Sequence, residues 1–171
     1  MTWEDTKMER VIQYNTYGRK VFIDLDGVVA DFESARDASG LSSAEFKLQK
    51  GSYRNLLPYS DAIESVQFIK DLGFDVWFAT KIPSKNPYAA TEKLLWVEQY
   101  FPDMVKSTII TPNKGTLGGR MDFLIDDRPH KAHCREFIGR LMTYGKHEHA
   151  EFRNWEQVCN FFSRVVSEVE L

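Results

Sequence analysis

Cysteine is scarce in this chain, which also lacks a long apolar run and a strong excess of either charge. Two cysteines, Cys134 and Cys159, occur among 171 residues. Two thiols are too few for a disulfide framework, so we expect both as reduced core residues. A membrane-spanning helix needs roughly 18 successive apolar residues, and no stretch approaches that length. The net charge of −3 provides no basic track for nucleic acid.

What is present fits one globular domain. The chain is 43% hydrophobic and 27% charged, a balance typical of proteins that bury a core. Its length corresponds to a single domain, which we assign to residues 1–171. Residues 1–20 are polar and charged and do not resemble a signal peptide. With two reduced cysteines and no membrane segment, a cytoplasmic location is expected, and a homodimer is compatible with the sequence.

Short apolar stretches alternate with helical patterns along the chain. We predict strands over 20–24, 74–79, 107–111, 121–125 and 140–144, and helices over 60–72, 88–100, 129–138 and 155–169. Such alternation predicts an α/β fold, a Rossmann-like parallel sheet with helices on both faces. For helix 60–72 we expect Ser60 or Asp61 as cap, and an apolar face of Ile63, Val66, Phe68, Ile69 and Leu72.

Residues 31–59 interrupt this alternation. Two short helices are predicted there, over 31–38 and 42–50, with Ser42 or Ser43 as the cap of the second. Because this stretch separates the first strand from the rest of the α/β pattern, we predict a small helical cap inserted after that strand.

The first strand leads directly into two aspartates. Residues 21–23 are apolar, and Asp24, Asp26 and Gly27 follow them. In an extended backbone the side chains at positions i and i+2 point the same way, so the two carboxylates would repel unless a positive group lies between them. A surface turn is the alternative interpretation, since Asp and Gly are common in turns. A calcium loop is disfavoured, because the acidic residues, the loop glycine and the final glutamate of such a loop do not line up here.

Other predicted strands also end in polar residues. Thr80 and Lys81 follow the second strand, Lys114 the third, and Asp126 and Asp127 the fourth. In parallel sheets, ligands bind beyond the carboxyl ends of the strands, so these side chains are expected at one edge together with Asp24 and Asp26.

This combination suits phosphoryl chemistry. Carboxylates from two strands can hold Mg²⁺, which binds one or two carboxylates, waters and a phosphate. A threonine hydroxyl and a lysine ammonium can donate to phosphate oxygens. One carboxylate can attack phosphorus, and a second, two residues on, can serve as acid and base.

The residues just described resemble the four motifs of the haloacid dehalogenase (HAD) superfamily of phosphotransferases. The resemblance implies a nucleophile at Asp24, an acid/base at Asp26, and phosphate binding by Thr80 and Lys114. It also implies a magnesium site formed by Asp24, the backbone carbonyl of Asp26, and the pair Asp126 and Asp127, with Asp127 as the direct ligand.

A narrower resemblance, over about residues 20–162, is to the 5'(3')-deoxyribonucleotidase family. It is carried by four segments of the sequence, Asp24–Phe32, Trp96–Phe101, Leu124–Pro129 and Asn154–Trp155. These enzymes remove phosphate from deoxyribonucleoside monophosphates, and the resemblance implies that Phe32 lies against the nucleotide base.

The chain departs from this family in two places. It has Thr80-Lys81 where the family usually has Thr-Ser, and its cap is shorter, which leaves substrate preference open. Lys81 is either a second phosphate contact or a solvated loop lysine. Tyr53 or Phe46 is expected to supply an aromatic wall, and Arg128 to anchor the acidic pair.

We therefore predict a magnesium-dependent phosphatase that acts on deoxyribonucleotides. The alternatives are a HAD phosphatase for a sugar phosphate or a nucleic-acid end, a phosphomutase, and a non-catalytic nucleotide-binding protein of the same fold. A zinc site at His130, His133 and Cys134 is disfavoured because their spacing fits no usual ligand pattern.

Overall fold

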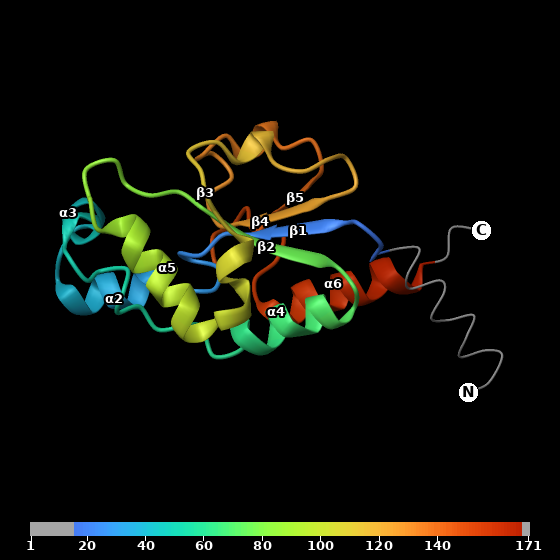
Figure 1. The fold of residues 1–171 in the computed structure, drawn as a ribbon, viewed down its shortest axis with the longest axis horizontal. Helices are drawn as coiled ribbons and strands as arrows, with labels where there is room; N and C mark the ends of the chain where they lie inside the picture. The colour runs from blue at the N-terminus through green and yellow to red at the C-terminus, as the bar shows by residue number, and fades with distance from the viewer. Residues whose placement is uncertain (1–15, 169–171) are drawn as a thin grey trace.

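The computed structural model describes residues 16–168, which form one parallel sheet with its covering helices (Figure 1). The strands are β1 (Lys20–Ile23), β2 (Asp75–Thr80), β3 (Thr108–Ile110), β4 (Phe123–Asp126) and β5 (Arg140–Thr143). Their order is β3-β2-β1-β4-β5, and all four neighbouring pairs are parallel. The predicted α/β fold with a parallel sheet is confirmed. The chain winds outward from β1 and then returns to β4, so β1 and β4 are neighbours at the switch point of the sheet.

Alternation along the central strands produces two cores. Val21 and Ile23 of β1 face the larger core, whereas Phe22 between them faces the smaller one. The larger core includes side chains from α4 (Ala62–Asp71), α5 (Ala89–Tyr100) and α6 (Trp155–Ser167). Figure 1 shows α4 and α6 side by side against the same side of the sheet.

The opposite face is covered differently from the prediction. Its core cluster joins Phe22 and Leu124 to Cys134 and Phe137, with the 3-10 turns η2 (Lys114–Thr116) and η3 (Cys134–Glu136) lying beside each other. The α-helix predicted over 129–138 is wrong. Ala132 and His133 both have positive φ angles, +49° and +57°, a left-handed conformation that no right-handed helix can contain.

The stretch between β1 and α4 contains two short helices, α2 (Phe32–Ser39) and α3 (Ser43–Leu48). Asp31 caps α2 by accepting a hydrogen bond from the backbone of Ser34. Ser42 and Glu45 form a reciprocal capping box at the start of α3, which confirms the predicted cap at Ser42. The extent of this cap as a separate unit remains a prediction.

Helix α4 presents a different face from the predicted one. Ile63 and Phe68 are 39% and 38% exposed. The helix begins at Ala62, and its buried stripe runs through residues 62, 65, 66 and 69 at helical spacing, which leaves Ile63 and Phe68 to one side. Asp61 occupies the cap position but its side chain makes no capping bond, because its backbone is already helical.

The polar N-terminal segment, predicted to hold no signal peptide, lies mostly outside the described residues, as does the last residue of the predicted helix 155–169. In the described part of the chain, every helix is too short or too polar to cross a membrane.

Candidate active site

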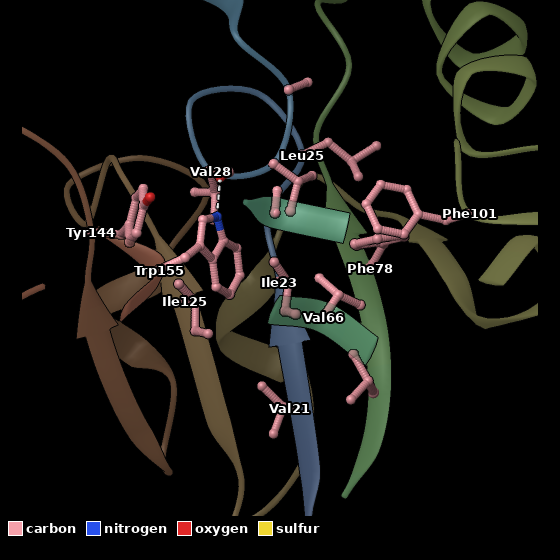
Figure 2. Packing of buried hydrophobic residues seen from close by; sticks show 14 of the residues in the cluster. Val21, Ile23, Leu25, Val28, Val66, Phe78, Phe101, Ile125, Tyr144 and Trp155 are labelled. Carbon is pink, nitrogen blue, oxygen red and sulfur yellow. Dashed lines mark hydrogen bonds between the residues drawn. The ribbon is translucent and has the colours of Figure 1, made fainter. Parts of the chain in front are cut away.

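The loop that follows β1 is tightly fixed. The carbonyl of Leu25 accepts hydrogen bonds from the backbone N–H groups of Val28, Val29 and Ala30. Figure 2 shows the indole of Trp155 on α6 reaching this loop, where its N–H donates to the carbonyl of Val28 at 3.0 Å. The loop carries Asp26, so these bonds hold the acidic motif in a defined position at the end of the strand.

Gly27 allows β1 and β4 to bring their acidic residues together. Its φ angle is +82°, and a Cβ built on it would lie 2.3 Å from Oδ2 of Asp127. Any side chain here would collide with that carboxylate and would be strained in this backbone conformation. The glycine after the two aspartates is therefore required by Asp127 as well as by the turn.

Several of the predicted residues line one cavity of about 230 Å³ beyond the carboxyl ends of the strands. Asp24 and Asp26 reach it from the loop after β1, and Asp126 from the end of the neighbouring β4. Its predicted lining members also include Lys114 and Tyr53. The remaining charged residues around the cavity are Lys47, Lys81, Arg128 and Lys131. Several of the predicted site residues thus lie at the switch point of the sheet, where α/β proteins bind ligands.

Lys114 lies between the two central strands. Its Nζ is 2.8 Å from Oδ1 of Asp24 and 2.6 Å from Oδ2 of Asp126, and the residue is only 2% exposed. Burial works against the lysine's charge, but the two carboxylates outweigh it and raise the pKa of Lys114. Burial likewise acts to raise the pKa of Asp24, yet the cations Lys114 and Lys93 prevail and hold that pKa below its ordinary value. Asp24 is thus kept as a carboxylate.

Three aspartates form a cluster suited to a divalent cation. One carboxylate oxygen from each of Asp24, Asp126 and Asp127 lies within 4.8 Å of the others. Oδ1 of Asp127 is buried without a hydrogen-bond partner, and the nearest cation, Nε of Arg128, is 3.7 Å away. Burial, and then the charge of Asp24, raise the pKa of Asp127 to about 8. The repulsion among these carboxylates, which contributes to the raised pKa, would be offset by a hard divalent cation bound to their oxygens.

Arg128 contributes to this cluster mainly through its backbone. Its N–H donates to Oδ1 of Asp126 at 2.8 Å, while its guanidinium only approaches Asp127. Among residues 16–168, the aspartate cluster is the group of potential ligands close enough to hold a metal. His133, one of the residues of the disfavoured zinc site, instead lies with its Nδ1 2.8 Å from Oε1 of Glu136.

Lys93 of α5 was not predicted as a site residue. It is 2% exposed, and its Nζ lies 2.5 Å from Oδ2 of Asp26 and 2.8 Å from Oγ1 of Thr80. The sequence did contain a signal, because Lys93 belongs, with residues 89, 92, 96 and 97, to the buried stripe of α5. A lysine on a buried helix face needs a buried partner.

The two residues predicted after β2 lie differently. Thr80 is fully buried and does not line the cavity, and its hydroxyl accepts a hydrogen bond from Lys93. Lys81 is exposed and does line the cavity, while its carbonyl accepts from Lys93 at 2.8 Å. Phosphate binding by either residue remains a prediction.

The cap side of the cavity is aromatic. Tyr53 lines it, and the ring of Phe32 packs on Tyr53 and Phe46 with centroid distances of 6.1 Å and 5.2 Å. Phe32 itself does not line the cavity, so its predicted contact with a base remains a prediction. Glu92, adjacent to Lys93, accepts the backbone N–H groups of Gly51 and Tyr53 and so anchors this wall to α5.

Comparison with known proteins identifies the family. The family model described as "5' nucleotidase, deoxy (Pyrimidine), cytosolic type C protein" matches residues 42–168. The chain belongs to this family. As a 5' nucleotidase it is a phosphoric monoester hydrolase, which confirms the predicted enzyme class and the predicted relationship. The matched range begins after Asp24 and Asp26, whose place beside the other site residues comes from the structure.

Individual relatives agree with this nucleotidase family. A putative 5'(3')-deoxyribonucleotidase of Vibrio phage KVP40 is 30% identical, over 84% of each chain. The human mitochondrial 5'(3')-deoxyribonucleotidase is 29% identical, and the match covers 64% of this chain and 62% of the human protein. A HAD-superfamily hydrolase from Ehrlichia chaffeensis has a TM-score of 0.52 at 12% identity, with 86% of this chain and 97% of that one covered, which supports the HAD-like fold.

Proposed function

We propose that this nucleotidase is a magnesium-dependent phosphatase that hydrolyses deoxyribonucleoside monophosphates through a phosphoryl group carried on Asp24. The observation that carries the proposal is the pairing of Asp24 with Lys114 beside the aspartate cluster. A buried carboxylate with a lowered pKa is available as a nucleophile, and the adjacent ammonium offsets the repulsion of an anionic substrate.

In the first step, Asp24 attacks the phosphorus atom of the substrate. A bond forms between its carboxylate oxygen and phosphorus, while the bond from phosphorus to the ester oxygen breaks. Asp26 lies on the same loop and lines the same cavity, so it can give a proton to the departing oxygen. The products of this step are the free nucleoside and a phosphoryl group on Asp24.

In the second step, a water molecule attacks the phosphorus of phospho-Asp24. Asp26, now a carboxylate, takes a proton from that water, and the bond between phosphorus and Asp24 breaks. Inorganic phosphate is released and both aspartates return to their starting state. The ammonium group of Lys114 stabilises the carboxylate of Asp24 as that carboxylate re-forms.

Magnesium would be held by Asp24, Asp126 and Asp127, and by the backbone carbonyl of Asp26 that the family resemblance implies. When bound, it supplies positive charge to the phosphate oxygens. The buried, unpartnered Oδ1 of Asp127 supports this ligand set.

The deoxyribonucleotide is favoured as substrate by the names of the phage and human relatives. The ring of Tyr53 supplies an aromatic surface at the cavity wall, which suits a nucleobase better than a sugar. We also propose Lys81 and Lys114 as contacts for the phosphate, since both line the cavity. A cytoplasmic location and a homodimer belong to this proposal as well.

The test measures phosphate release by the purified protein with Mg²⁺, from dUMP, dTMP, the corresponding ribonucleotides and sugar phosphates. We expect the highest kcat/KM with the deoxyribonucleotides, and loss of activity with EDTA. Faster turnover of sugar phosphates, or full activity in EDTA, would contradict the proposal.

A further inference from the structure

We infer that Lys93 is a positioning residue that holds the carboxyl group of Asp26 in place for proton transfer to the leaving group. The inference rests on the proposed function, since it assigns a task within that reaction. Lys93 lies on α5, whereas the reacting groups Asp24 and Asp26 follow the end of β1.

All three protons of the Lys93 ammonium are used within the protein. They are directed to Oδ2 of Asp26 at 2.5 Å, to Oγ1 of Thr80 at 2.8 Å and to the carbonyl oxygen of Lys81 at 2.8 Å. A lysine ammonium has three donors and no acceptor. Lys93 therefore has no proton left for a phosphate oxygen, and it does not line the cavity.

The surroundings keep Lys93 in one place. The residue is 2% exposed, and its Nζ lies 4.6 Å from the ring centroid of Tyr53. One turn along α5, the indole N–H of Trp96 donates to the carbonyl of Leu56 at 2.8 Å and joins the helix to the chain segment before α4. A buried ammonium with three hydrogen bonds and an aromatic neighbour has little freedom to move.

This arrangement constrains Asp26 in turn. Its Oδ2 is occupied by Lys93, whereas no hydrogen bond to its Oδ1 is found among residues 16–168. Asp26 lines the cavity, so Oδ1 is the oxygen free to meet the leaving group. Lys114 binds Asp24 and Asp126 but does not bind Asp26. The two buried lysines thus have different partners. Lys114 binds Asp24, the proposed nucleophile, and Lys93 binds Asp26, the proposed acid.

The test compares two substrates that differ in their need for an acid. A nucleotide releases an alkoxide-type oxygen that must be protonated, whereas p-nitrophenyl phosphate releases a stable phenolate that needs no proton. The readout is kcat/KM, which covers the steps up to departure of the leaving group, so that the later attack of water does not enter. The ratio of the two values in one sample is independent of the fraction of folded protein.

For Lys93→Met we expect kcat/KM with dUMP to fall roughly 100-fold, the lower range for loss of a general acid, and with p-nitrophenyl phosphate less than about threefold. Inhibition by inorganic phosphate should be unchanged. Lys93→Arg keeps the charge with different donor geometry and should give an intermediate ratio. If Lys93→Met does not fold, the ratio of kcat/KM with dUMP to kcat/KM with p-nitrophenyl phosphate in Lys93→Arg tests the inference instead. The control is Lys70→Met, which removes a lysine from an exposed pair with Asp103 and should change neither value.

Equal losses with both substrates would overturn the inference and leave the proposed function intact. So would weaker inhibition by phosphate, because Lys93 would then be a phosphate ligand. Wild-type protein inactive towards both esters would overturn the proposed function, and the inference with it.

Discussion

Gly27 and Asp127 approach each other so closely that a Cβ on the glycine would lie 2.3 Å from the aspartate's Oδ2. The two residues come from the loop after β1 and the loop after β4, which are neighbours in the sheet. Their contact brings the backbone of the nucleophile loop against the proposed metal ligand. The site therefore depends on a residue without any side-chain chemistry.

Gly27→Ala should displace Asp127 and weaken metal binding. We expect the Mg²⁺ concentration for half-maximal phosphatase activity to rise at least about tenfold, together with a loss of about 1–2 kcal/mol in stability from the positive φ angle. The matched control is Gly40→Ala, where φ is +69° but nothing lies within 4 Å of the new Cβ. If both variants lose stability alike and neither changes the metal requirement, Gly27 has no role beyond its turn.

Lys114→Met should leave Asp24 and Asp126 facing each other without a counter-charge. Breaking a buried ion pair costs about 3–5 kcal/mol, and we expect a loss of that order in the free energy of unfolding of the metal-free protein. Turnover should fall roughly 10²–10³-fold through lost charge stabilisation. Urea titration and phosphate release measure the two effects. Lys20→Met is the control, because its pair with Asp75 is at the surface at 3.5 Å and should cost less than about 1 kcal/mol.

The raised pKa of Asp127 predicts how stability varies with pH without metal. The folded protein holds a proton on Asp127 up to about pH 8, whereas the unfolded chain releases it near the ordinary value of 3.8. The contribution of Asp127 is therefore complete at low pH and is lost as the pH rises to about 8, with a slope of at most ~1.4 kcal/mol per pH unit.

Asp127→Asn should remove this contribution to the slope, which corresponds to one bound proton, or at most ~1.4 kcal/mol per pH unit. Urea unfolding in EDTA between about pH 5 and 8 measures it in both proteins. Burial and the charge of Asp24 also raise the pKa of Asp126. Asp126 therefore continues to contribute to the pH dependence of stability in the variant. Identical slopes in the two proteins would show that Asp127 is already ionised without metal.

Tyr53→Leu should weaken nucleotide binding by removing the aromatic face from the cavity. Stacking of a base on an aromatic ring is worth about 1–3 kcal/mol, so KM for dTMP should rise roughly tenfold or more, and KM for a sugar phosphate should change little. Tyr88→Leu is the control, since Tyr88 is 47% exposed and outside the cavity. An equal rise in KM for both substrates would argue against a base-binding surface at Tyr53.

Much of this arrangement could be predicted because parallel strands place their ends at one edge. The predicted strands agree with the observed ones within one or two residues, and Asp24, Lys114 and Asp126 meet at that edge as expected. The position of each residue followed from a buried apolar run and the polar residue after it. No knowledge of side-chain packing was needed.

The remaining features depend on packing that a linear pattern does not contain. Lys93 was missed because a lysine on a helix is usually solvated, and its partners lie far away in sequence. A turn at Ala132 and His133 replaces a predicted helix, because both residues have positive φ angles. Neither residue type indicates such an angle in the sequence. Ile63 and Phe68 were placed on the wrong face because the start of α4 sets the phase of its buried stripe.

The central claim is that the phosphoryl group passes through Asp24. The most direct measurement is rapid acid quenching of the enzyme during turnover of dUMP with Mg²⁺, followed by peptide mass spectrometry. We predict a phosphoryl group on the peptide that contains Asp24, and neither this modification nor turnover in Asp24→Asn. Turnover by Asp24→Asn at the wild-type rate, or a phosphoryl group on another residue, would contradict the account.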